Sequence, residues 1–378
     1  MKVLVVTNDF PPRIGGIQYY VERLVDGLVA AGDRVVVYAS SYAGAAEWDA
    51  ARPYTVVRAA TPTMLPTPVV TARVLALVKE HRPDVLVFGA AVPLGLMGPV
   101  VRARHGVPYV AFTHGLEVSS VRLPAGGLPL RAVGSRAAAV TYVSHWCRDL
   151  LEPAFGAGPV HQLLPPAVDP EVFHAGVDGS PVRRRYGLDA VPLVVCVSRL
   201  VERKGQDTVI EAFAEVRRRV PDAHLLVVGD GPHRSALEAQ AARSGHADRV
   251  VFTGSVPDDE LAAHYAAGDV FAMPCRERKG GLEVEAFGIV FIQAEAVGVP
   301  VVAGNIGGVP DALVDGRTGL LVDPTDTGQV AEALALLLSD PARAAALGAE
   351  GAAWVAEGFT WPARTAQLRD LLAQVVAG

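Results

Sequence analysis

The chain has 378 residues, of which 51% are hydrophobic and 20% are charged, and this length exceeds what one hydrophobic core usually supports, so we expect two domains. The formal net charge of −6 argues against a general nucleic-acid-binding protein. The widely spaced Cys147, Cys196 and Cys275 show neither a paired disulfide framework nor metal-ligand spacing, which predicts a reducing, cytoplasmic environment.

The N-terminal segment MKVLVV runs directly into a strand pattern, with no basic region, long apolar core or cleavage site before it. No apolar run in the sequence approaches the ~18 residues that a membrane-spanning helix needs. We therefore expect a cytoplasmic protein that is neither secreted nor membrane-spanning.

The first half of the chain alternates strand and helix patterns. Apolar residues recur at helical spacing from Ile17 to Ala31, and Gly32 marks the stop. Continuous apolar runs predict strands at residues 2–7, 34–39, 84–88, 107–112 and 140–143. Because these strands are continuously apolar and separated by helices, they indicate an α/β domain with a doubly wound parallel sheet.

A second series of the same kind follows a stretch rich in Pro, Gly and charge. Its helix is expected at residues 207–220, with Asp207 as the N-cap. Its strands are expected at residues 193–197, 224–228, 250–253, 270–273 and 299–303.

These patterns predict two Rossmann-like domains that face an interdomain cleft at the carboxyl ends of both sheets. The first domain is expected at residues 1–170, the linker at 171–189 and the second domain at 190–359. A C-terminal helix at about residues 360–378 is expected to pack back on the first domain.

Gly15 and Gly16 stand between the first strand and its helix, where a phosphate can approach a backbone that has no Cβ. A tight turn is the simpler alternative. Neither half opens with G-x-G-x-x-G, and this absence argues against a nicotinamide dehydrogenase.

Arg199 and Lys204 follow the first strand of the second half and precede a helix. Two cations beside a helix N-terminus suit a diphosphate. The alternative is a solvated basic loop.

His114 directly follows a buried strand of the first half, which places it at the predicted cleft rim. A plain structural role is the alternative.

The stretch PCRERKGGLEVEAFGIV predicts a strand end, a charged loop and a helix N-terminus in succession. Glu283 and Glu285 lie in its loop, and the helix is expected to open with Phe287, Gly288, Ile289 and Val290. The free backbone N–H groups of that first turn should then face a ligand that lies beside the two carboxylates. A charged surface loop is the alternative.

Taken together, these residues resemble the retaining GT-B glycosyltransferases of family 4 over essentially the whole chain. The segments TNDFPPRIGGIQ, THGLEV, SRLVERKGQD and GGLEVEAFGIV are similar to those of actinobacterial GDP-mannose-dependent mannosyltransferases, especially the enzymes that act on phosphatidylinositol monomannoside. The resemblance implies GDP-mannose as co-substrate, no other cofactor, and a glycolipid or small-molecule hydroxyl as acceptor.

The resemblance also implies roles for individual residues. Gly15 and Gly16 would meet the donor diphosphate, and Arg199 and Lys204 would neutralise it. His114 would touch the transferred sugar. Glu285, the first acid of the family's E-x7-E motif, would hold sugar hydroxyls, while the backbone from Phe287 to Val290 orients sugar and phosphate. The base would lie near Gly229 and Val256.

Gln293 departs from this motif, because the family has a second glutamate there that binds ribose hydroxyls. A glutamine lacks the charge and the second accepting oxygen. The departure leaves donor identity open, and it motivates the alternative of a catalytically silent sugar-nucleotide-binding protein.

Retention requires no protein nucleophile if the departing diphosphate accepts the acceptor's proton on the same face, so positioning and charge stabilisation would carry catalysis. The chain contains no D-x-D, and no metal is predicted.

Acceptor choice is expected to depend on the loops of the first domain. A soluble small molecule is an alternative to a glycolipid. Residues 121–131 mix apolar and basic side chains, as a peripheral membrane contact would. Their glycines and prolines argue against a regular helix over much of this segment.

Overall fold

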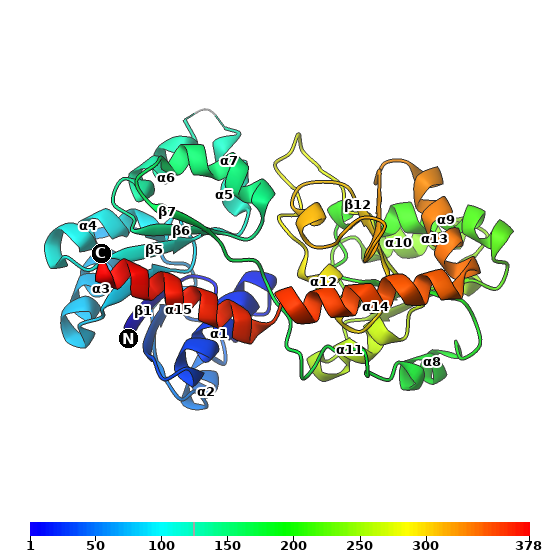
Figure 1. Cartoon of the computed structure of the whole chain (residues 1–378), viewed down its shortest axis with the longest axis horizontal. Coiled ribbons are helices and arrows are strands. Elements are labelled where there is room, and N and C mark those ends of the chain that lie inside the picture. Colours follow the sequence, from blue (N-terminus) through cyan, green and yellow to red (C-terminus); the bar gives the residue numbers. More distant parts are fainter. Residues whose placement is uncertain (124) are drawn as a thin grey trace. The chain divides into compact units, whose positions relative to one another are not determined.

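A computed structural model describes residues 1–123 and 125–378 of the chain (Figure 1). The described residues form two compact units, one of Met1–Pro166 with Trp361–Gly378 and one of Ala167–Thr360. Each unit is built on a parallel sheet whose strands alternate with helices along the chain. The prediction of two doubly wound α/β domains is therefore confirmed.

The sheet of the first unit has the strand order β3-β2-β1-β4-β5-β6-β7 within the described residues. The four-residue strands β4, β5 and β6 are buried along their whole length, because helices cover both faces of the sheet. The strands are β1 Lys2–Thr7, β2 Arg34–Ala39, β3 Thr55–Arg58, β4 Val85–Phe88, β5 Tyr109–Phe112, β6 Ala139–Tyr142 and β7 Val160–Leu163.

Helices of the first unit come from both ends of the chain. The C-terminal helix α15 belongs to this unit and packs against α1 (Figure 1). The helices are α1 Gly16–Ala30, α2 Ala45–Ala50, α3 Pro68–His81, η1 Leu94–Met97, α4 Gly98–His105, α5 Leu116–Val121, α6 Gly127–Gly134, α7 His145–Phe155 and α15 Trp361–Ala377.

Arg58, the last residue of β3, holds the loop 8–16 that follows β1. Its guanidinium donates to Pro11 O at 2.6 Å, to Ser40 O at 2.9 Å and to an oxygen of Asp49 at 2.6 Å. One side chain therefore joins the ends of β1, β2 and β3, and the position of the loop depends on it.

The sheet of the second unit has the order β10-β9-β8-β11-β12-β13. Its strands are β8 Leu193–Val197, β9 His224–Val228, β10 Val250–Gly254, β11 Val270–Met273, β12 Val301–Gly304 and β13 Gly319–Val322. Its helices are α8 Ser180–Tyr186, η2 Glu202–Lys204, α9 Gln206–Arg219, α10 Arg234–Arg243, η3 Ala247–Arg249, α11 Asp258–Ala266, α12 Ile289–Ala296, η4 Val309–Asp311, α13 Thr327–Ser339 and α14 Pro341–Gly358.

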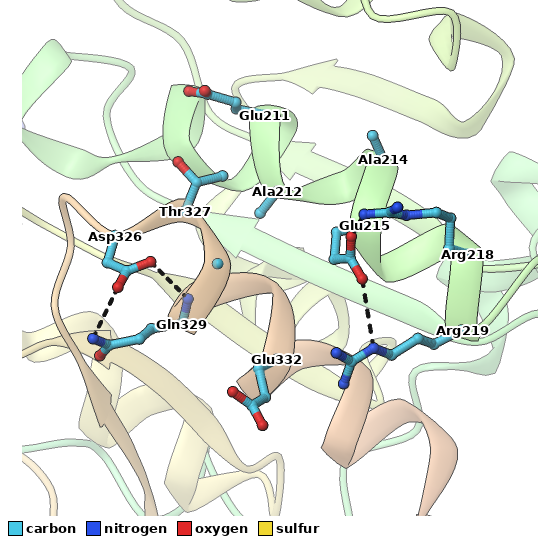
Figure 2. Close-up of a pocket in the computed structure, with 11 residues that line it drawn as sticks. Glu211, Ala212, Ala214, Glu215, Arg218, Arg219, Asp326, Thr327, Gln329 and Glu332 are labelled. Carbon is cyan, nitrogen blue, oxygen red and sulfur yellow. Dashed lines mark hydrogen bonds and ion pairs between the residues drawn. The ribbon is translucent and has the colours of Figure 1, made fainter.

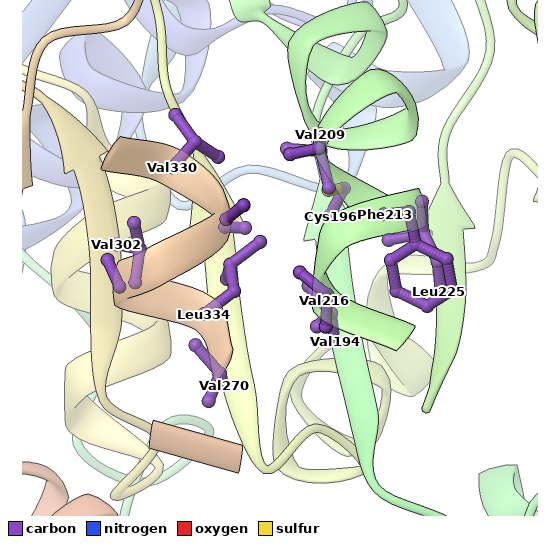
Figure 3. Packing of buried hydrophobic residues seen from close by; sticks show 14 of the residues in the cluster. Val194, Cys196, Val209, Phe213, Val216, Leu225, Val270, Val302, Val330 and Leu334 are labelled. Atoms are coloured by element: carbon purple, nitrogen blue, oxygen red, sulfur yellow. The ribbon is translucent and has the colours of Figure 1, made fainter. Parts of the chain in front are cut away.

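The core of the second unit lies between this sheet and the helices α9 and α13 (Figure 3). Phe213 and Val216 from α9 and Leu334 from α13 pack against Val194 of β8 and Val270 of β11, all nearly inaccessible to solvent. This layer fixes the strands whose carboxyl ends carry the candidate site.

Three strands that the sequence did not predict are edge strands. β3 and β7 close the two sides of the first sheet, and β13 closes one side of the second. Each has four residues and is only partly buried. β3 (TVVR) and β7 (VHQL) include polar residues, whereas β13 (GLLV) is apolar but short and begins with a glycine.

Three local expectations are corrected by the structure. Gly205, not Asp207, is the N-cap of α9, and Asp207 lies in the first turn. The stretch 171–189 contains a helix, α8, whose Val182 is buried. Residues 127–131 of the stretch 121–131 are helical, because they begin α6. Pro129 is compatible with the helix because it lies in the first turn, where its missing N–H is not needed. Pro124, in the same stretch, lies outside the described residues.

Replacing Arg58 with lysine should lower the free energy of unfolding of the first unit by about 2 kcal/mol, because the N–H groups of an ammonium all lie on one atom and cannot reproduce the planar set of donors that the guanidinium extends to Pro11, Ser40 and Asp49. Urea unfolding followed by circular dichroism measures this change. Arg317→Lys is the matched control. Its exposed pair with Glu350, at 3.0 Å, should contribute less than about 0.5 kcal/mol. An Arg58→Lys effect no larger than the control's would contradict the anchoring role.

Candidate functional site

Each sheet has one point at which the strand order reverses. In the second unit β8 and β11 are neighbours, and the chain continues from them toward opposite edges. In the first unit β1 and β4 are the corresponding neighbours. Ligands of open α/β sheets bind at the carboxyl ends of strands at such points. The loops that follow β1 and β8 carry the predicted glycine pair and basic residues.

Glu285 follows β11 and is the centre of an ion-pair cluster in the second unit. Its Oε2 accepts hydrogen bonds from Lys204 Nζ and from Arg203 Nη1, both at 2.6 Å. The side chains of Lys204 and Glu285 are 11% and 12% exposed, so water screens their pair weakly. Both cations use the same oxygen, which leaves Oε1 free of these contacts.

The two cations decide the charge of Glu285. Burial by itself raises the pKa of this carboxyl, but the charges and hydrogen bonds of Lys204 and Arg203 outweigh burial and lower the pKa to about 2. Glu285 is therefore ionised at neutral pH. Sequence reasoning paired Lys204 with this region but missed Arg203. The signal was present, since Arg203 is adjacent to Lys204 in the same loop.

Glycines allow the loops of this cluster to approach each other. Gly205 has φ of 77°, and a Cβ there would lie 2.1 Å from Pro274 O, so the loops after β8 and β11 meet at a glycine. Gly307 has φ of 54°, and its Cβ would lie 2.4 Å from Glu285 O. The next residue, Gly308, donates its N–H to that carbonyl at 3.0 Å.

The helix after Glu285 starts later than predicted. α12 begins at Ile289, Gly288 is its N-cap with φ of 90°, and the buried Phe287 lies before the helix. The N–H groups of Ile289 and Val290 belong to the first turn and have no intrahelical partner. The positive end of α12 therefore lies within a few residues of the Glu285 carboxylate.

Arg199 is exposed at the end of β8, and its side chain makes no ion pair or hydrogen bond with the described residues. It stays outside the Glu285 cluster. Gly229, after β9, has φ of 125°, and a Cβ there would lie 2.1 Å from Ser198 O. Val256 follows β10 and is half-buried. Arg199, Gly229 and Val256 therefore lie in loops at the same sheet edge.

Gln293 lies in α12 with 7% of its surface exposed. Its Oε1 accepts a hydrogen bond from the hydroxyl of Tyr265 in α11 at 2.9 Å. Sequence reasoning did not find Tyr265, because this contact joins two helices that no motif connects.

In the first unit, Gly15 is the N-cap of α1 and Gly16 is its first residue. A Cβ on Gly15 would lie 2.2 Å from Oε1 of Gln18, whereas a Cβ on Gly16 would meet nothing within 4 Å. Gln18 in turn donates from Nε2 to Oδ1 of Asp9 at 2.7 Å. A side chain at Gly15 would displace the amide of Gln18, whereas Gly16 leaves open space at the helix N-terminus.

His114 follows β5, and its Nε2 lies 2.5 Å from the carbonyl oxygen of Gly89, which follows β4. A carbonyl can only accept, so Nε2 carries the proton and Nδ1 is left as an acceptor. Burial lowers the pKa of His114 to about 4, and the hydrogen bond to Gly89 only partly opposes it. The imidazole is therefore neutral at pH 7.

Glu117, which sequence reasoning did not select, holds the His114 loop from the first turn of α5. Its Oε2 accepts the backbone N–H of His114 at 3.1 Å, and the residue is 1% exposed. Burial raises the pKa of Glu117 to about 7 against the opposing backbone hydrogen bonds. An acid three residues after the histidine, at a helix start, was the available signal.

A groove of about 600 Å³ lies between α9 and α13 of the second unit (Figure 2). Four carboxylates line it, those of Glu211, Glu215, Asp326 and Glu332, and Glu215 pairs with Arg219 at 3.6 Å. Arg218 and Arg219 also line the groove, but the carboxylates outnumber them, so the lining does not suit a diphosphate, and no predicted site residue belongs to it.

Among residues 1–123 and 125–378, no group of three or more His, Cys, Asp or Glu side chains is arranged as a metal site. None of the helices in this part of the chain is both long and apolar enough to cross a membrane.

Comparisons with known proteins cover the whole chain. The model of Glycosyltransferase Family 4 matches residues 14–172, and that of Glycosyl transferases group 1 matches residues 182–354. A GDP-mannose-dependent alpha-(1-6)-phosphatidylinositol monomannoside mannosyltransferase of Mycolicibacterium smegmatis is 48% identical over 374 residues, which are 98% of each chain. The protein of that name from Mycobacterium tuberculosis is 46% identical over 376 residues, again 98% of each chain.

Among solved structures, a sucrose-phosphate synthase of Thermosynechococcus elongatus is 25% identical and has a TM-score of 0.83, over 100% of this chain and 99% of the other. The family models and the full-length relatives agree with the resemblance that the motifs carry. The chain belongs to the family 4 glycosyltransferases, and its two parallel-sheet units have the GT-B fold.

Proposed function

We propose that this glycosyltransferase transfers mannose from GDP-mannose, with retention and without a metal ion, to a hydroxyl of a phosphatidylinositol mannoside-type glycolipid. The observation that carries the proposal is the 48% identity, over 98% of both chains, with a relative whose name states this donor and this acceptor class. The Glu285 cluster at the switch point of the second unit supports a sugar-nucleotide site.

The second unit would bind the donor. Lys204 and Arg199 would neutralise the diphosphate, and the N-terminus of α12 would add its unpaired N–H groups. Arg203 would keep Glu285 ionised when the diphosphate draws Lys204 toward itself. The free Oε1 of Glu285 would then accept a hydrogen bond from a hydroxyl of the transferred sugar.

The first unit would bind the acceptor and the reacting end of the sugar. Gly16 offers open space at the start of α1 for an oxygen-rich group. The neutral His114 presents Nδ1 as an acceptor for a sugar hydroxyl, and it cannot act as a general acid at neutral pH.

The reaction then needs no protein nucleophile. The bond between the anomeric carbon and the diphosphate oxygen breaks as the acceptor oxygen bonds to that carbon on the same face. The acceptor's proton passes to the departing diphosphate, and the products are GDP and the mannosylated acceptor. Catalysis would rest on positioning and on the cations that stabilise the leaving charge.

A glycolipid acceptor implies contact with a membrane surface at the cytoplasmic face. Leu123, before α6, and Leu128, in the first turn of α6, are 54% and 63% exposed. Arg122 and Arg131 lie in the same segment. Exposed apolar residues with basic neighbours suit an anionic bilayer surface.

The proposed function predicts transfer of labelled mannose from GDP-mannose to phosphatidylinositol monomannoside in mixed micelles, with excess EDTA present. The label should enter the lipid phase, since the cations of the second unit replace a metal ion. Labelling only of a soluble aminocyclitol offered alongside would point to another acceptor class. Loss of transfer in EDTA that magnesium or manganese restores would contradict metal independence, and binding of GDP-mannose without any turnover would indicate a silent binding protein.

Lys204→Ala and Arg199→Ala should each lower kcat/KM by about 30-fold, because each removes a cation from a developing diphosphate charge, which is worth ~2 kcal/mol. Initial rates of transfer measure the effect. Arg219→Ala is a control, since Arg219 is exposed at the end of α9, away from the β8 loop. Normal rates in a folded Lys204 or Arg199 variant would remove that residue from the phosphate site.

Glu285→Gln should lower kcat by more than about tenfold while the Kd of GDP stays within about threefold of wild type. Bare GDP carries no hexose for Glu285 to hold, and loss of the carboxylate frees Lys204 for the diphosphate. Isothermal titration with GDP and initial rates separate the two effects. If the variant loses GDP binding as well, Glu285 contacts the nucleotide and not the sugar.

A further inference from the structure

Gln293 is joined to a fully buried tyrosine. Its Oε1 accepts from the Tyr265 hydroxyl at 2.9 Å, and both residues lie in the second unit. The Tyr265 ring packs against Phe173 and Phe271, with ring centroids 6.1 and 5.6 Å away. Because aromatic neighbours hold the ring, the phenol oxygen has a fixed position beside α12.

The phenol proton has one acceptor within the described part of the chain, which is Oε1 of Gln293. Burial raises the pKa of Tyr265 well above its ordinary value, so the proton stays on the oxygen. A buried hydroxyl without an acceptor is costly, which is why the phenol donates and the carbonyl end of the amide faces it.

The orientation of one amide end fixes the other. The Nε2 group of Gln293 makes no hydrogen bond with the described residues, and it is not among their buried, unpartnered polar atoms, so it keeps contact with solvent. Rotating the amide by half a turn would place Nε2 against the phenol oxygen and leave the phenol proton without an acceptor. Tyr265 therefore disfavours the rotated form.

We propose that Tyr265 is a positioning residue that holds the Gln293 amide with its NH2 end toward the ligand, so that position 293 donates hydrogen bonds to the ribose hydroxyl oxygens and accepts none. This inference rests on the proposed function and on the place beside the donor ribose that the family resemblance implies for position 293. A glutamate at this position would also accept from Tyr265, but its second oxygen would accept from the ribose. The exchange of Glu for Gln thus reverses the direction of the hydrogen bond to the nucleotide.

The first test observes the amide directly. In a nitrogen-15 spectrum, the side-chain NH2 resonance of Gln293 is the one absent from Gln293→Glu. GDP should shift this resonance, and 2′,3′-dideoxy-GDP should not. Equal shifts with both nucleotides, or a shift with neither, would overturn the proposed contact between the NH2 group and the ribose.

The second test measures how much the ribose hydroxyls contribute to affinity. Wild type should bind GDP about fivefold more tightly than the dideoxy nucleotide, as expected for one hydrogen bond. In Tyr265→Phe the ratio of the two affinities should fall below about twofold, with affinity for dideoxy-GDP unchanged. The ring stays in this variant, and only the hydroxyl that orients the Gln293 amide is lost. Tyr109→Phe is the matched control, because Tyr109 is a buried phenol of the first unit that donates to Val133 O at 2.5 Å. It should keep the wild-type ratio.

The outcomes separate this inference from the proposed function. No measurable GDP binding by wild type would contradict the proposed function itself. A ratio that persists in Gln293→Ala would mean that the ribose lies elsewhere. A ratio that needs Gln293 but survives Tyr265→Phe would overturn the role of Tyr265 alone. If Tyr265→Phe weakens the binding of GDP and of dideoxy-GDP equally, the tyrosine is merely structural. That result would also overturn the role of Tyr265 alone.

Discussion

The candidate site depends on one buried anion that two cations keep ionised. An ionised carboxylate with 12% exposure is unfavourable unless it is paired, and the ion pairs of Glu285 with Lys204 and Arg203 offset that cost. The loops after β8 and β11 must therefore come close together. Gly205 makes this possible, because any side chain there would collide with the backbone of Pro274.

The geometry of that cluster divides the two oxygens of Glu285 between two tasks. Both cations contact Oε2, so in the proposed function Oε1 is the oxygen that would accept from a sugar hydroxyl. Having two cations also matters, since one of them can move toward a bound diphosphate while the other keeps the carboxylate charged. A single lysine could not pair fully with both the Glu285 carboxylate and a bound diphosphate.

The sequence predicts those parts of the structure that depend on local patterns. Inner strands such as β1 and β8 have continuous apolar runs, whereas the edge strands β3 and β7 include polar residues and are only partly buried. The edge strand β13 is apolar, but it has only four residues and begins with a glycine. The motif residues Lys204 and Glu285 were found, and the structure joins them. Arg203 was missed although it is adjacent to Lys204 in the same loop. Tyr265 was missed because it contacts a residue 28 positions away in another helix.

The two buried groups Glu285 and His114 differ in whether burial decides the pKa, and the difference follows from the neighbours that each side chain has. In the second unit, opposite charges overcome burial and hold the pKa of Glu285 at about 2. In the first unit His114 faces a carbonyl and aromatic rings, so burial prevails and its pKa falls to about 4. In the proposed function, the second unit would therefore supply charge for a diphosphate, while the neutral His114 would bind a sugar hydroxyl without competing for that charge.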